Sequence, residues 1–486
     1  MNRHFLHKGL AAAGSIAAAT SCAPTKEAPL PRPNIVFILA DDLGWGDLGC
    51  YGQQLFETPN IDSIAASGLR FTQSYSGTTV SAPSRSCLLT GTHSGHTAIR
   101  GNLELDPEGQ FPLPAGSENI FRDLKAAGYR TGAFGKWGLG FIGSTGDPQA
   151  QGVDRFYGYN CQLLAHSYYP DHLWDNEKRV EIPENYNDET YGQGVYSQDL
   201  IHGKALEFLE EAARDAQPFF MWYPTIIPHA ELLVPEDSLI RKYRGRYPEQ
   251  PYRGTDAGMP GFRRGGYVSQ PEPHATFAAM VGRLDVYVGQ IVGKLRELDL
   301  YDNTILIFAS DNGPHREGGA DPDFFDSNGP WRGYKRDVYE GGIRVPMIIA
   351  WPGHIAAGTQ TDFICSFWDL MPTLRELTGQ GQTEGLDGIS LLPLLEGRPG
   401  QKEHDYLYFE FQELGGRQAL RRGPWKLVHL AVRSNQPVFE LYNLSEDPGE
   451  TTDLSAAYPD TLSALRQLML EAHIPNPDFP LLPGED

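Results

Sequence analysis

Residues 34–42 read Asn-Ile-Val-Phe-Ile-Leu-Ala-Asp-Asp, an apolar run that stops at two carboxylates. A continuous apolar run is typical of a strand buried on both faces, as in a parallel sheet covered by helices. Residues 304–312 repeat the pattern, since Thr-Ile-Leu-Ile-Phe-Ala-Ser is followed by Asp311 and Asn312. The two stretches predict inner strands of one mostly parallel sheet.

Further strands and helices alternate along the chain. Strand-like runs span residues 131–134, 218–223 and 344–350. Helical patterns lie between them, at residues 60–67, 117–127, 197–213 and 275–298. This alternation predicts an α/β fold with a mostly parallel, mixed sheet between helices.

Polar residues follow several of the predicted strands. In open α/β sheets, ligands bind beyond the carboxyl ends of the strands. We therefore expect one edge of the sheet to bring together Asp41, Asp42, Lys136, His229, Asp311 and Asn312.

The pattern changes after about Gly379. Short strands separated by turns are expected at residues 406–411, 419–428 and 439–443, with a helix at 461–472. The sequence thus predicts a large catalytic domain at residues 34–378 and a small antiparallel α+β domain at 379–486.

The composition excludes some partners. The 486 residues include 62 acidic and 40 basic ones, a formal charge of −22. Nucleic acids and anionic membranes require clustered Lys and Arg, so neither is an expected partner.

The N-terminus is typical of an exported bacterial lipoprotein. Residues 1–22 combine a basic start, a short apolar stretch and Cys22, a candidate for lipidation, although a frayed helix is the alternative. The Pro-rich residues 23–33 suit a linker. We expect a periplasmic or outer-membrane protein that meets the membrane only through the lipid, because no other run approaches about 18 apolar residues.

The remaining cysteines form no recognisable framework. Their spacing is wide and irregular, which leaves either one disulfide or four buried thiols open. They are Cys50, Cys87, Cys161 and Cys365.

Three carboxylates and an amide oxygen at one sheet edge would repel one another without a cation. All are hard oxygen ligands, which favours Ca²⁺ or Mg²⁺ over zinc. A turn or helix cap would explain Asp41-Asp42 alone, but a second polar strand end at Asp311-Asn312 favours the metal.

Residues 80–91, Val-Ser-Ala-Pro-Ser-Arg-Ser-Cys-Leu-Leu-Thr-Gly, predict the start of a helix. Ser81 stands where an N-cap belongs and Pro83 suits the first turn. A helix N-terminus also attracts anions, and Arg85 lies one turn further on. Ser81 is therefore either a cap or a nucleophile at an anion site.

The same stretch resembles the signature of the type I sulfatases, in which a Cys or Ser at the first position is oxidised to formylglycine. In this sequence it reads Ser81-Ala-Pro-Ser-Arg85, followed by Leu88-Leu-Thr-Gly91. Other family motifs occur in order: Pro33-Asn-Ile35 ahead of Asp41-Asp-Leu-Gly44, Gly135-Lys-Trp137, Ser310-Asp-Asn-Gly313, and Lys335 ahead of Tyr339-Glu-Gly-Gly-Ile-Arg-Val-Pro346. The resemblance covers nearly all of the mature chain and implies an alkaline-phosphatase-like fold.

The resemblance also implies roles. Ca²⁺ would be held by Asp41, Asp42, Asp311, Asn312 and the modified Ser81. Arg85, Lys136 and Lys335 would offset the negative charge of the sulfate and the nucleophile, and His229 would protonate the leaving alcohol. A serine-type maturase would form the formylglycine, whose hydrate offers one hydroxyl to attack sulfur and a second whose deprotonation expels sulfate.

One position departs from the family. Many members read Gly-Lys-Trp-His, with the histidine as base, but this chain has Gly138 in the histidine's place. We expect His166, in the segment 161–172, to replace that base, although a structural or sugar-binding histidine is an equal alternative.

Candidate substrate contacts are Arg100 and His172. Arg suits a forked contact with oxygen ligands, and residues 161–172 resemble a segment of carbohydrate-directed members. Surface-loop and packing roles remain the alternatives. The aromatics that could stack on a sugar, or simply pack, are Tyr168, Tyr169, Trp174 and Trp331.

The sequence therefore predicts a hydrolase that removes sulfate from a sulfated carbohydrate. The resemblance carried by residues 161–170 implies that the sulfated unit is a galactose or an N-acetylgalactosamine. A phosphodiester or phosphonate ester hydrolase of the same superfamily is one alternative. A non-catalytic sulfated-glycan-binding lipoprotein is another, because of Gly138.

Overall fold

The computed structural model describes residue 1 and residues 32–215, 217–381 and 383–485. The predicted signal peptide with Cys22, and most of the predicted linker, lie outside these residues. Residues 33–486 group together as one unit.

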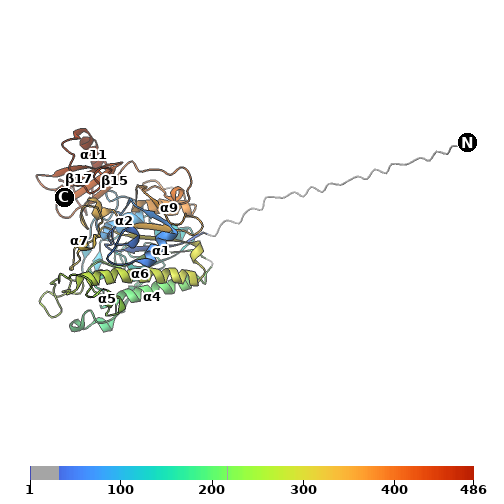
Figure 1. Ribbon diagram of the computed structural model, residues 1–486, viewed down its shortest axis with the longest axis vertical. Helices are drawn as coiled ribbons and strands as arrows, with labels where there is room; N and C mark the ends of the chain where they lie inside the picture. Colours follow the sequence, from blue (N-terminus) through green and yellow to red (C-terminus); the bar gives the residue numbers. More distant parts are fainter. Residues whose placement is uncertain (2–31, 216, 382, 486) are drawn as a thin grey trace. The chain divides into compact units, whose positions relative to one another are not determined.

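A ten-stranded mixed sheet lies at the centre of this unit, in the order β13-β2-β12-β11-β1-β10-β6-β7-β8-β9 (Figure 1). β1 (Asn34–Ala40) pairs in parallel with β10 (Phe219–Pro224) and β11 (Thr304–Ser310). β6 (Arg130–Lys136) and β7 (Arg155–Tyr159) extend the parallel part. The other strands of the sheet are β2 (Leu69–Phe71), β8 (His172–Asp175), β9 (Lys178–Glu181), β12 (Met347–Ala350) and β13 (Thr359–Thr361).

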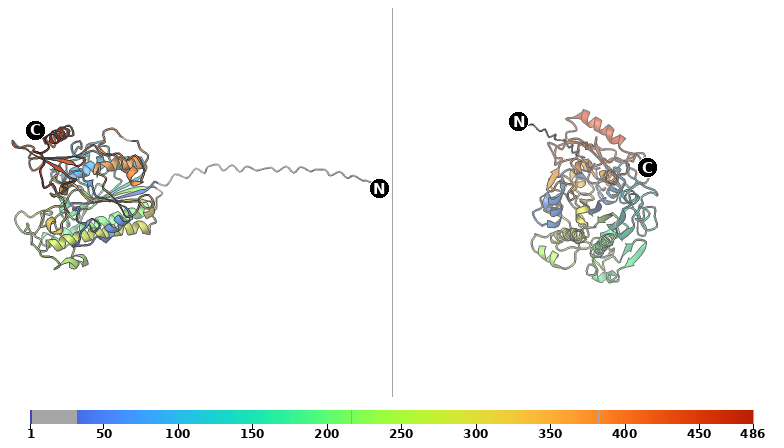
Figure 2. Two further views of the ribbon diagram at one scale, coloured as in Figure 1. Left: turned by 45° about the horizontal axis from the view of Figure 1, so that its top comes forward. Right: turned by 90° about the vertical axis from the view of Figure 1, so that its right-hand side faces the viewer.

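Helices cover both faces of the sheet, because successive side chains of a strand point to opposite sides. Val36 and Ile38 of β1 belong to the core that includes α1 (Pro59–Ser67), α4 (Ser197–Ala212), α5 (Ser238–Tyr243) and α6 (Pro273–Glu297). Ile35 and Phe37 belong to the opposite core, with α2 (Ser81–Thr90), α3 (Ile120–Ala126), α9 (Leu370–Leu377) and α10 (Leu392–Leu395). Figure 2 shows the sheet between these layers, which confirms the predicted α/β architecture.

A second, four-stranded antiparallel sheet follows, as predicted. It contains β15 (Leu407–Phe411), β16 (Arg417–Arg422), β17 (Trp425–Leu430) and β18 (Val438–Asn443), with α11 (Pro459–Glu471) packed on one face. The single strand expected at residues 419–428 is wrong, because Gly423, with φ +56°, turns the chain back after β16 and pairs β16 with β17.

Smaller elements complete the described chain. They are β3 (Ser74–Tyr75), β4 (Glu104–Leu105), β5 (Gly109–Gln110), β14 (Cys365–Ser366), α7 (Pro322–Phe325) and α8 (Glu340–Ile343). Short 3₁₀ helices include Leu164–His166.

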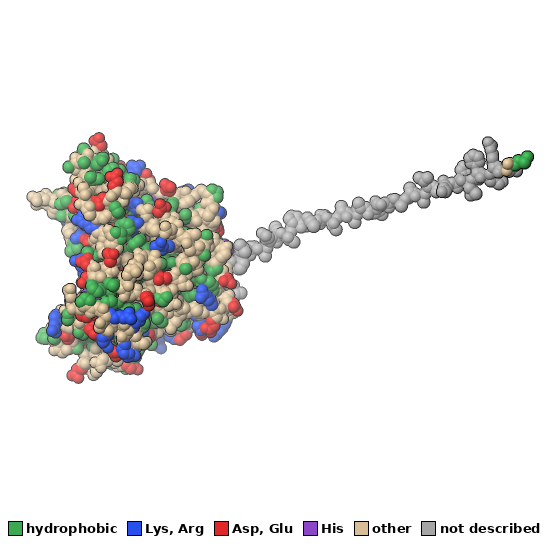
Figure 3. All heavy atoms as spheres, in the orientation of Figure 1, with side chains coloured by type: hydrophobic (Ala, Val, Ile, Leu, Met, Phe, Trp, Pro, Cys, Tyr) green, Lys and Arg blue, Asp and Glu red, His purple; other side chains and the backbone are tan. Residues whose placement is uncertain are grey.

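The four cysteines at positions 50, 87, 161 and 365 are free thiols, so the disulfide alternative does not hold among them. Acidic and basic side chains are interspersed on the face that Figure 3 shows. Within the described residues, no helix combines the length and the apolar character needed to cross a membrane.

Candidate active site

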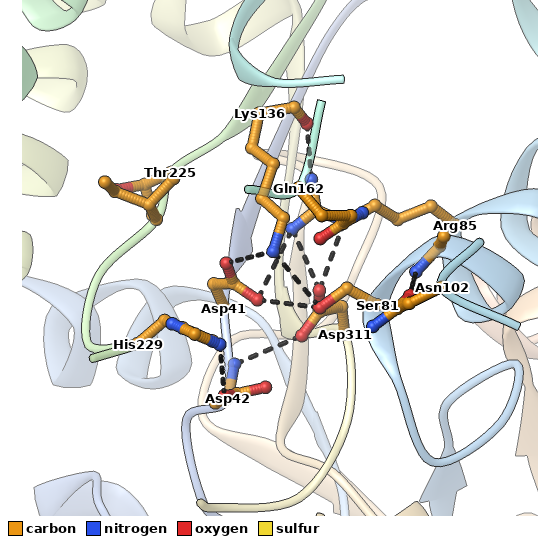
Figure 4. Close-up of polar contacts among 12 residues, drawn as sticks. Asp41, Asp42, Ser81, Arg85, Asn102, Lys136, Gln162, Thr225, His229 and Asp311 are labelled. Atoms are coloured by element: carbon orange, nitrogen blue, oxygen red, sulfur yellow. Dashed lines mark hydrogen bonds and ion pairs between the residues drawn. The ribbon is translucent and has the colours of Figure 1, made fainter. Parts of the chain in front are cut away.

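The carboxyl ends of the parallel strands β1, β6, β10 and β11 meet at one edge of the sheet. The six polar side chains expected there do lie together, and Figure 4 labels all of them except Asn312. Lys136 Nζ lies 2.7 Å from Asp41 Oδ2, and His229 Nε2 lies 3.3 Å from Asp42 Oδ2. All are almost fully buried, which makes their charges strongly dependent on one another.

The backbone at Asp42 sets this arrangement. Asp42 has a φ of +62°, a left-handed conformation that Asp tolerates better than most side chains. Its N–H donates to Asp311 Oδ1 at 3.1 Å, and the next N–H, of Leu43, donates to Ser310 Oγ at 2.9 Å. The end of β1 is thereby fixed to the end of β11.

The oxygen atoms at this edge fit a hard divalent cation. Carboxylate oxygens of Asp41, Asp42 and Asp311 lie within 4.8 Å of one another. Asn312 Nδ2 donates to Asp42 Oδ1 at 2.6 Å, while the buried Asn312 Oδ1 has no hydrogen-bond partner in the described part of the chain. Burial and the nearby Asp41 raise the pKa of Asp311 to about 7, which means that the ionised form of this carboxyl is disfavoured in the site as it stands. An orphan amide oxygen beside three carboxylates is a donor set that suits Ca²⁺.

Ser81 faces this cluster. Its Oγ donates to Asp41 Oδ1 at 2.9 Å and lies 3.4 Å from Lys136 Nζ. The capping interpretation of Ser81 is wrong, because extended Val80 is the N-cap of α2 and Ser81 is the first helical residue. Its hydroxyl therefore does not cap the helix and instead contacts Asp41 and Lys136.

Arg85, one turn along α2, joins two strand ends. Its Nε and Nη2 lie 3.1 and 2.8 Å from Asp311 Oδ2, and its Nη1 donates to the carbonyl of Lys136. The guanidinium is fully buried. A buried, forked cation of this kind fixes the position of the carboxylate that it contacts.

His229 and Lys335 form a second polar pair. His229 Nδ1 donates to the carbonyl of Ala230, which leaves Nε2 to accept from Lys335 Nζ at 2.8 Å. Burial, followed by the charge of Lys335, holds the pKa of His229 well below its usual value. Lys335 also lies 2.9 Å from Asp42 Oδ2 and 3.2 Å from Glu317 Oε2.

A cavity of about 140 Å³ opens beside these residues, lined among others by Ser81, Lys136, Gln162, His166, His229 and Lys335. The His166 ring stacks on His229, with centroids 4.7 Å apart. Burial lowers the pKa of His166 to about 3, so this histidine is neutral at pH 7. His166 and Ser81 thus line the same cavity.

The two predicted substrate contacts lie elsewhere. Arg100 is buried, its Nη1 3.0 Å from Glu410 Oε1 and 2.6 Å from the carbonyl of Ile474, and it does not line this cavity. Its guanidinium bonds to Glu410 of the C-terminal sheet. Arg100 is therefore neither an exposed loop residue nor part of the wall of this cavity.

His172 borders a neighbouring cavity of about 540 Å³. Its ring nitrogens lie 2.6 Å from Asp171 Oδ1 and 2.8 Å from Glu108 Oε2, so carboxylates occupy both. Glu104 lines both cavities, which makes them adjacent.

The aromatic candidates mostly pack. Tyr168 is buried and its hydroxyl donates to the carbonyls of Ile226 and His229. Trp174 Nε1 donates to Glu108 Oε1 at 2.8 Å, and Trp331 lies under the guanidinium of Arg344.

Sequence reasoning missed two members of the site. Glu317 stands five residues after Asn312, in the same loop, and contacts Lys335. Gln162 stands in the segment 161–172 that was singled out for its histidines. For Glu317, its place within a few positions of a predicted ligand was the available signal.

The comparisons agree with this geometry. The family model described as Sulfatase matches residues 33–380, and one described as N-sulphoglucosamine sulphohydrolase, C-terminal, matches residues 329–473. Arylsulfatase A of Homo sapiens is 33% identical, with 90% of this chain and 87% of that protein covered. N-acetylgalactosamine-6-sulfatase of Sus scrofa is 31% identical, with 91% and 85% covered.

Solved structures share the fold. Ps i-CgsB, crystallised with k-i-k-neocarrahexaose, is 28% identical with a TM-score of 0.72, covering 91% of this chain and 93% of that one. The phosphonate monoester hydrolase of Agrobacterium radiobacter, at 21% identity and a TM-score of 0.63 over 91% and 95%, shares the fold alone. The sequence motifs, the polar edge of the sheet and these matches lead to one conclusion: the chain belongs to the sulfatase family and is a sulfuric ester hydrolase.

Proposed function

We propose that this enzyme removes an O-sulfate group from a sulfated carbohydrate, using formylglycine formed from Ser81 and bound Ca²⁺. The observation that carries the proposal is the position of Ser81 Oγ, in contact with Asp41 and beside Lys136 at the polar edge of the sheet. Asp41, Asp42, Asp311, Asn312 and residue 81 would hold the ion, which would supply electrostatic stabilisation of developing negative charge.

The surroundings of Ser81 favour a modified residue over a plain serine nucleophile. Among the described residues, the hydrogen-bond partners of Ser81 Oγ are Asp41 and Lys136, and neither is a histidine. Burial would raise the pKa of Asp41, but Lys136, His229 and Arg85 together hold it well below its usual value, so Asp41 is a weak base. An aldehyde hydrate at residue 81 would supply the two hydroxyl groups that attack and release require.

The cations and histidines then take distinct roles. Lys136 and Lys335 offset the charge of the sulfate, and Arg85 holds Asp311 in place. His229 is the proposed proton donor to the leaving oxygen, because the negative charge of a bound sulfate ester would raise its pKa and oppose the charge of Lys335, whose Nζ lies 2.8 Å from Nε2. His166 lines the same cavity and is the proposed proton acceptor during sulfate release, because the negative charge of a bound sulfate would oppose the charges of Lys136 and Lys335 that, after burial, lower its pKa.

The saccharide is proposed to extend into the neighbouring cavity that His172 borders. Similarity to an N-acetylgalactosamine-6-sulfatase and to a structure that contains a carrageenan hexasaccharide supports a sulfated galactose or N-acetylgalactosamine unit. The N-terminal sequence supports export as a lipoprotein anchored at Cys22, after conversion of Ser81 by a serine-type maturase.

The first test is the mass of the proteolytic peptide that carries Ser81, after expression with and without a serine-type maturase. Loss of two hydrogen atoms, with or without hydration, is the expected result. An unmodified serine despite an active maturase would contradict the proposal.

Sulfate release from defined sulfated mono- and oligosaccharides then tests the reaction. Faster turnover of aryl phosphate or phosphonate esters than of aryl sulfates would favour the phosphoester alternative. Binding of sulfated glycans by the converted protein, without release, would favour a binding lipoprotein.

A further inference from the structure

Gln162 occupies the space beside Ser81 that a side chain at position 138 would need. Gly138 has a φ of +72°, and a Cβ built on it would lie 2.3 Å from Gln162 Nε2. Two features therefore favour glycine at position 138, just after β6: the left-handed backbone conformation and the neighbouring carboxamide. The carboxamide of Gln162 and a side chain at position 138 therefore exclude each other.

The Gln162 carboxamide is buried and has no hydrogen-bond partner among the residues that the structure describes. The residue is 2% exposed, and within that part of the chain both Nε2 and Oε1 are unpartnered. Burying a polar group without a partner costs about 1–3 kcal/mol for each group, so such a residue needs an explanation. Its backbone is fixed, because its N–H donates to Gln110 Oε1 at 3.1 Å.

The free carboxamide faces the reaction cavity. Gln162 lines the same small cavity as Ser81, Lys136 and Lys335, and Figure 4 shows it among the side chains around Ser81. Lys136 and Lys335 make this cavity suited to an anion. The carboxamide in the cavity wall offers Nε2 as a donor and Oε1 as an acceptor to a bound ligand.

We propose that Gln162 is a substrate-contacting residue of this sulfatase: its Nε2–H donates to a sulfate oxygen, and its Oε1 accepts from the side chain of residue 81. The proposal rests on the function proposed above. A carboxamide takes up no proton near neutral pH, so Gln162 orients the reacting groups and leaves proton transfer to a histidine. The contact satisfies both orphan atoms at once.

Two variants separate hydrogen bonding from packing. Gln162→Met keeps the length of the side chain and removes the carboxamide, whereas Gln162→Glu keeps the shape and adds negative charge. Gln198→Met is the matched control, because Gln198 is also buried with an unpartnered Nε2 but does not line the cavity. Thermal unfolding of each variant establishes that it folds.

The first readout is the dissociation constant of inorganic sulfate, measured by calorimetry with Ca²⁺ on the unconverted Ser81 protein. Gln162→Met should weaken binding by about 10- to 100-fold, as expected for a lost hydrogen bond to an anion. Gln162→Glu should weaken it further, and Gln198→Met should leave it unchanged. Equal binding by wild type and Gln162→Met, or no sulfate binding by wild type, would overturn the proposal.

Steady-state kinetics of the converted enzyme give the second readout. Gln162→Met should lower kcat/KM with a larger loss in kcat than rise in KM, because the contact to residue 81 acts during reaction. Unchanged kinetics would also overturn the proposal. Hydrolysis of an aryl sulfate by the converted wild type tests the proposed function separately.

Discussion

At the residue scale, Arg85 and Arg100 present two buried guanidinium groups with different partners. Arg85 contacts Asp311 and the carbonyl of Lys136, inside the site, whereas Arg100 contacts Glu410 at the C-terminal sheet. A lysine cannot reproduce the several directed hydrogen bonds of either guanidinium. The two positions therefore form a matched pair for separating catalytic from structural loss.

We expect Arg85→Lys to lower kcat/KM by about 10²- to 10³-fold, since it removes fixed donors from a buried charged site. Arg100→Lys should lower the free energy of unfolding and leave KM close to wild type. Steady-state kinetics and urea unfolding of both variants check this. A raised KM in Arg100→Lys, with unchanged stability, would restore Arg100 as a substrate contact.

Asp47 predicts a pH dependence of stability. It is fully buried, its Oδ2 accepts from the N–H of Gly44 at 2.8 Å, and its Oδ1 has no partner. Burial raises its pKa from 3.8 to about 7. Between these pKa values the folded state binds a proton that the unfolded state has lost, so stability present below pH 4 is lost as the pH rises to 7.

Asp47→Asn should remove this dependence, because the amide stays neutral and keeps an oxygen for Gly44. Relative to wild type, the variant should gain stability between pH 4 and 7, by on the order of 1–4 kcal/mol. Urea unfolding at several pH values measures the difference. Parallel stability curves for the two proteins would contradict the prediction.

Most charged residues of the site could be predicted, whereas Gln162 could not. Asp41 and Asp311 directly follow continuous apolar strands, and parallel strands bring their carboxyl ends together. Gln162 lies in a loop after β7, and its position depends on the space left at Gly138. No periodic pattern in the sequence indicates that this space beside Gly138 exists.

At the element scale, the central strands were the most predictable. β1 and β11 have the predicted limits, because both strands are apolar at every inner position and end at charged residues. The outer strands β2, β9 and β13 escaped prediction, since they are short or polar. Such outer strands form because they pair with a neighbouring strand, and not because both of their faces are buried.

A buried charge network joins the C-terminal sheet to α8. Lys426 Nζ, on β17, lies 2.9 Å from Glu340 Oε1 of α8 and 2.8 Å from Glu450 Oε1, and all three side chains are fully buried. Burial, opposed by Lys426, raises the pKa of Glu450 to about 7. Removing the lysine would leave two carboxylates to repel each other.

Lys426→Met should therefore destabilise the protein by about 3–5 kcal/mol, the range for breaking a buried ion pair. The double variant Lys426→Met with Glu450→Gln should recover part of that loss, because the repulsion between the two carboxylates is gone and Arg344 Nη1 still lies 3.2 Å from Glu340 Oε2. Lys178→Met, on the exposed surface of β9, is the control and should change stability by less than about 0.5 kcal/mol. Urea unfolding measures all three, and additive losses in the double variant would rule out the coupling.

At the scale of the whole molecule, the proposed calcium site lies at the carboxyl ends of the central strands β1 and β11. Its candidate ligands follow β1 and β11, which pair along their full length, and Ser81 adds the start of α2. These elements come from positions far apart in the chain and from both the sheet and its covering helices. An ion held there would be bound by the folded state alone, so its binding should stabilise the entire unit.

Removing calcium should therefore lower the unfolding temperature as well as abolish sulfate release. A free Ca²⁺ concentration 100-fold above the dissociation constant would contribute about 2.7 kcal/mol to stability. Differential scanning calorimetry with EDTA, with Ca²⁺ and with Mg²⁺ measures the shift, and restored Ca²⁺ should recover both stability and activity. Asn312→Leu, which removes the orphan amide oxygen, should reduce the Ca²⁺-dependent shift even in unconverted protein that has no activity. A shift of the same size in Asn312→Leu and wild type would mean that Ca²⁺ binds elsewhere, whereas no shift in wild type would contradict a calcium site coupled to the fold.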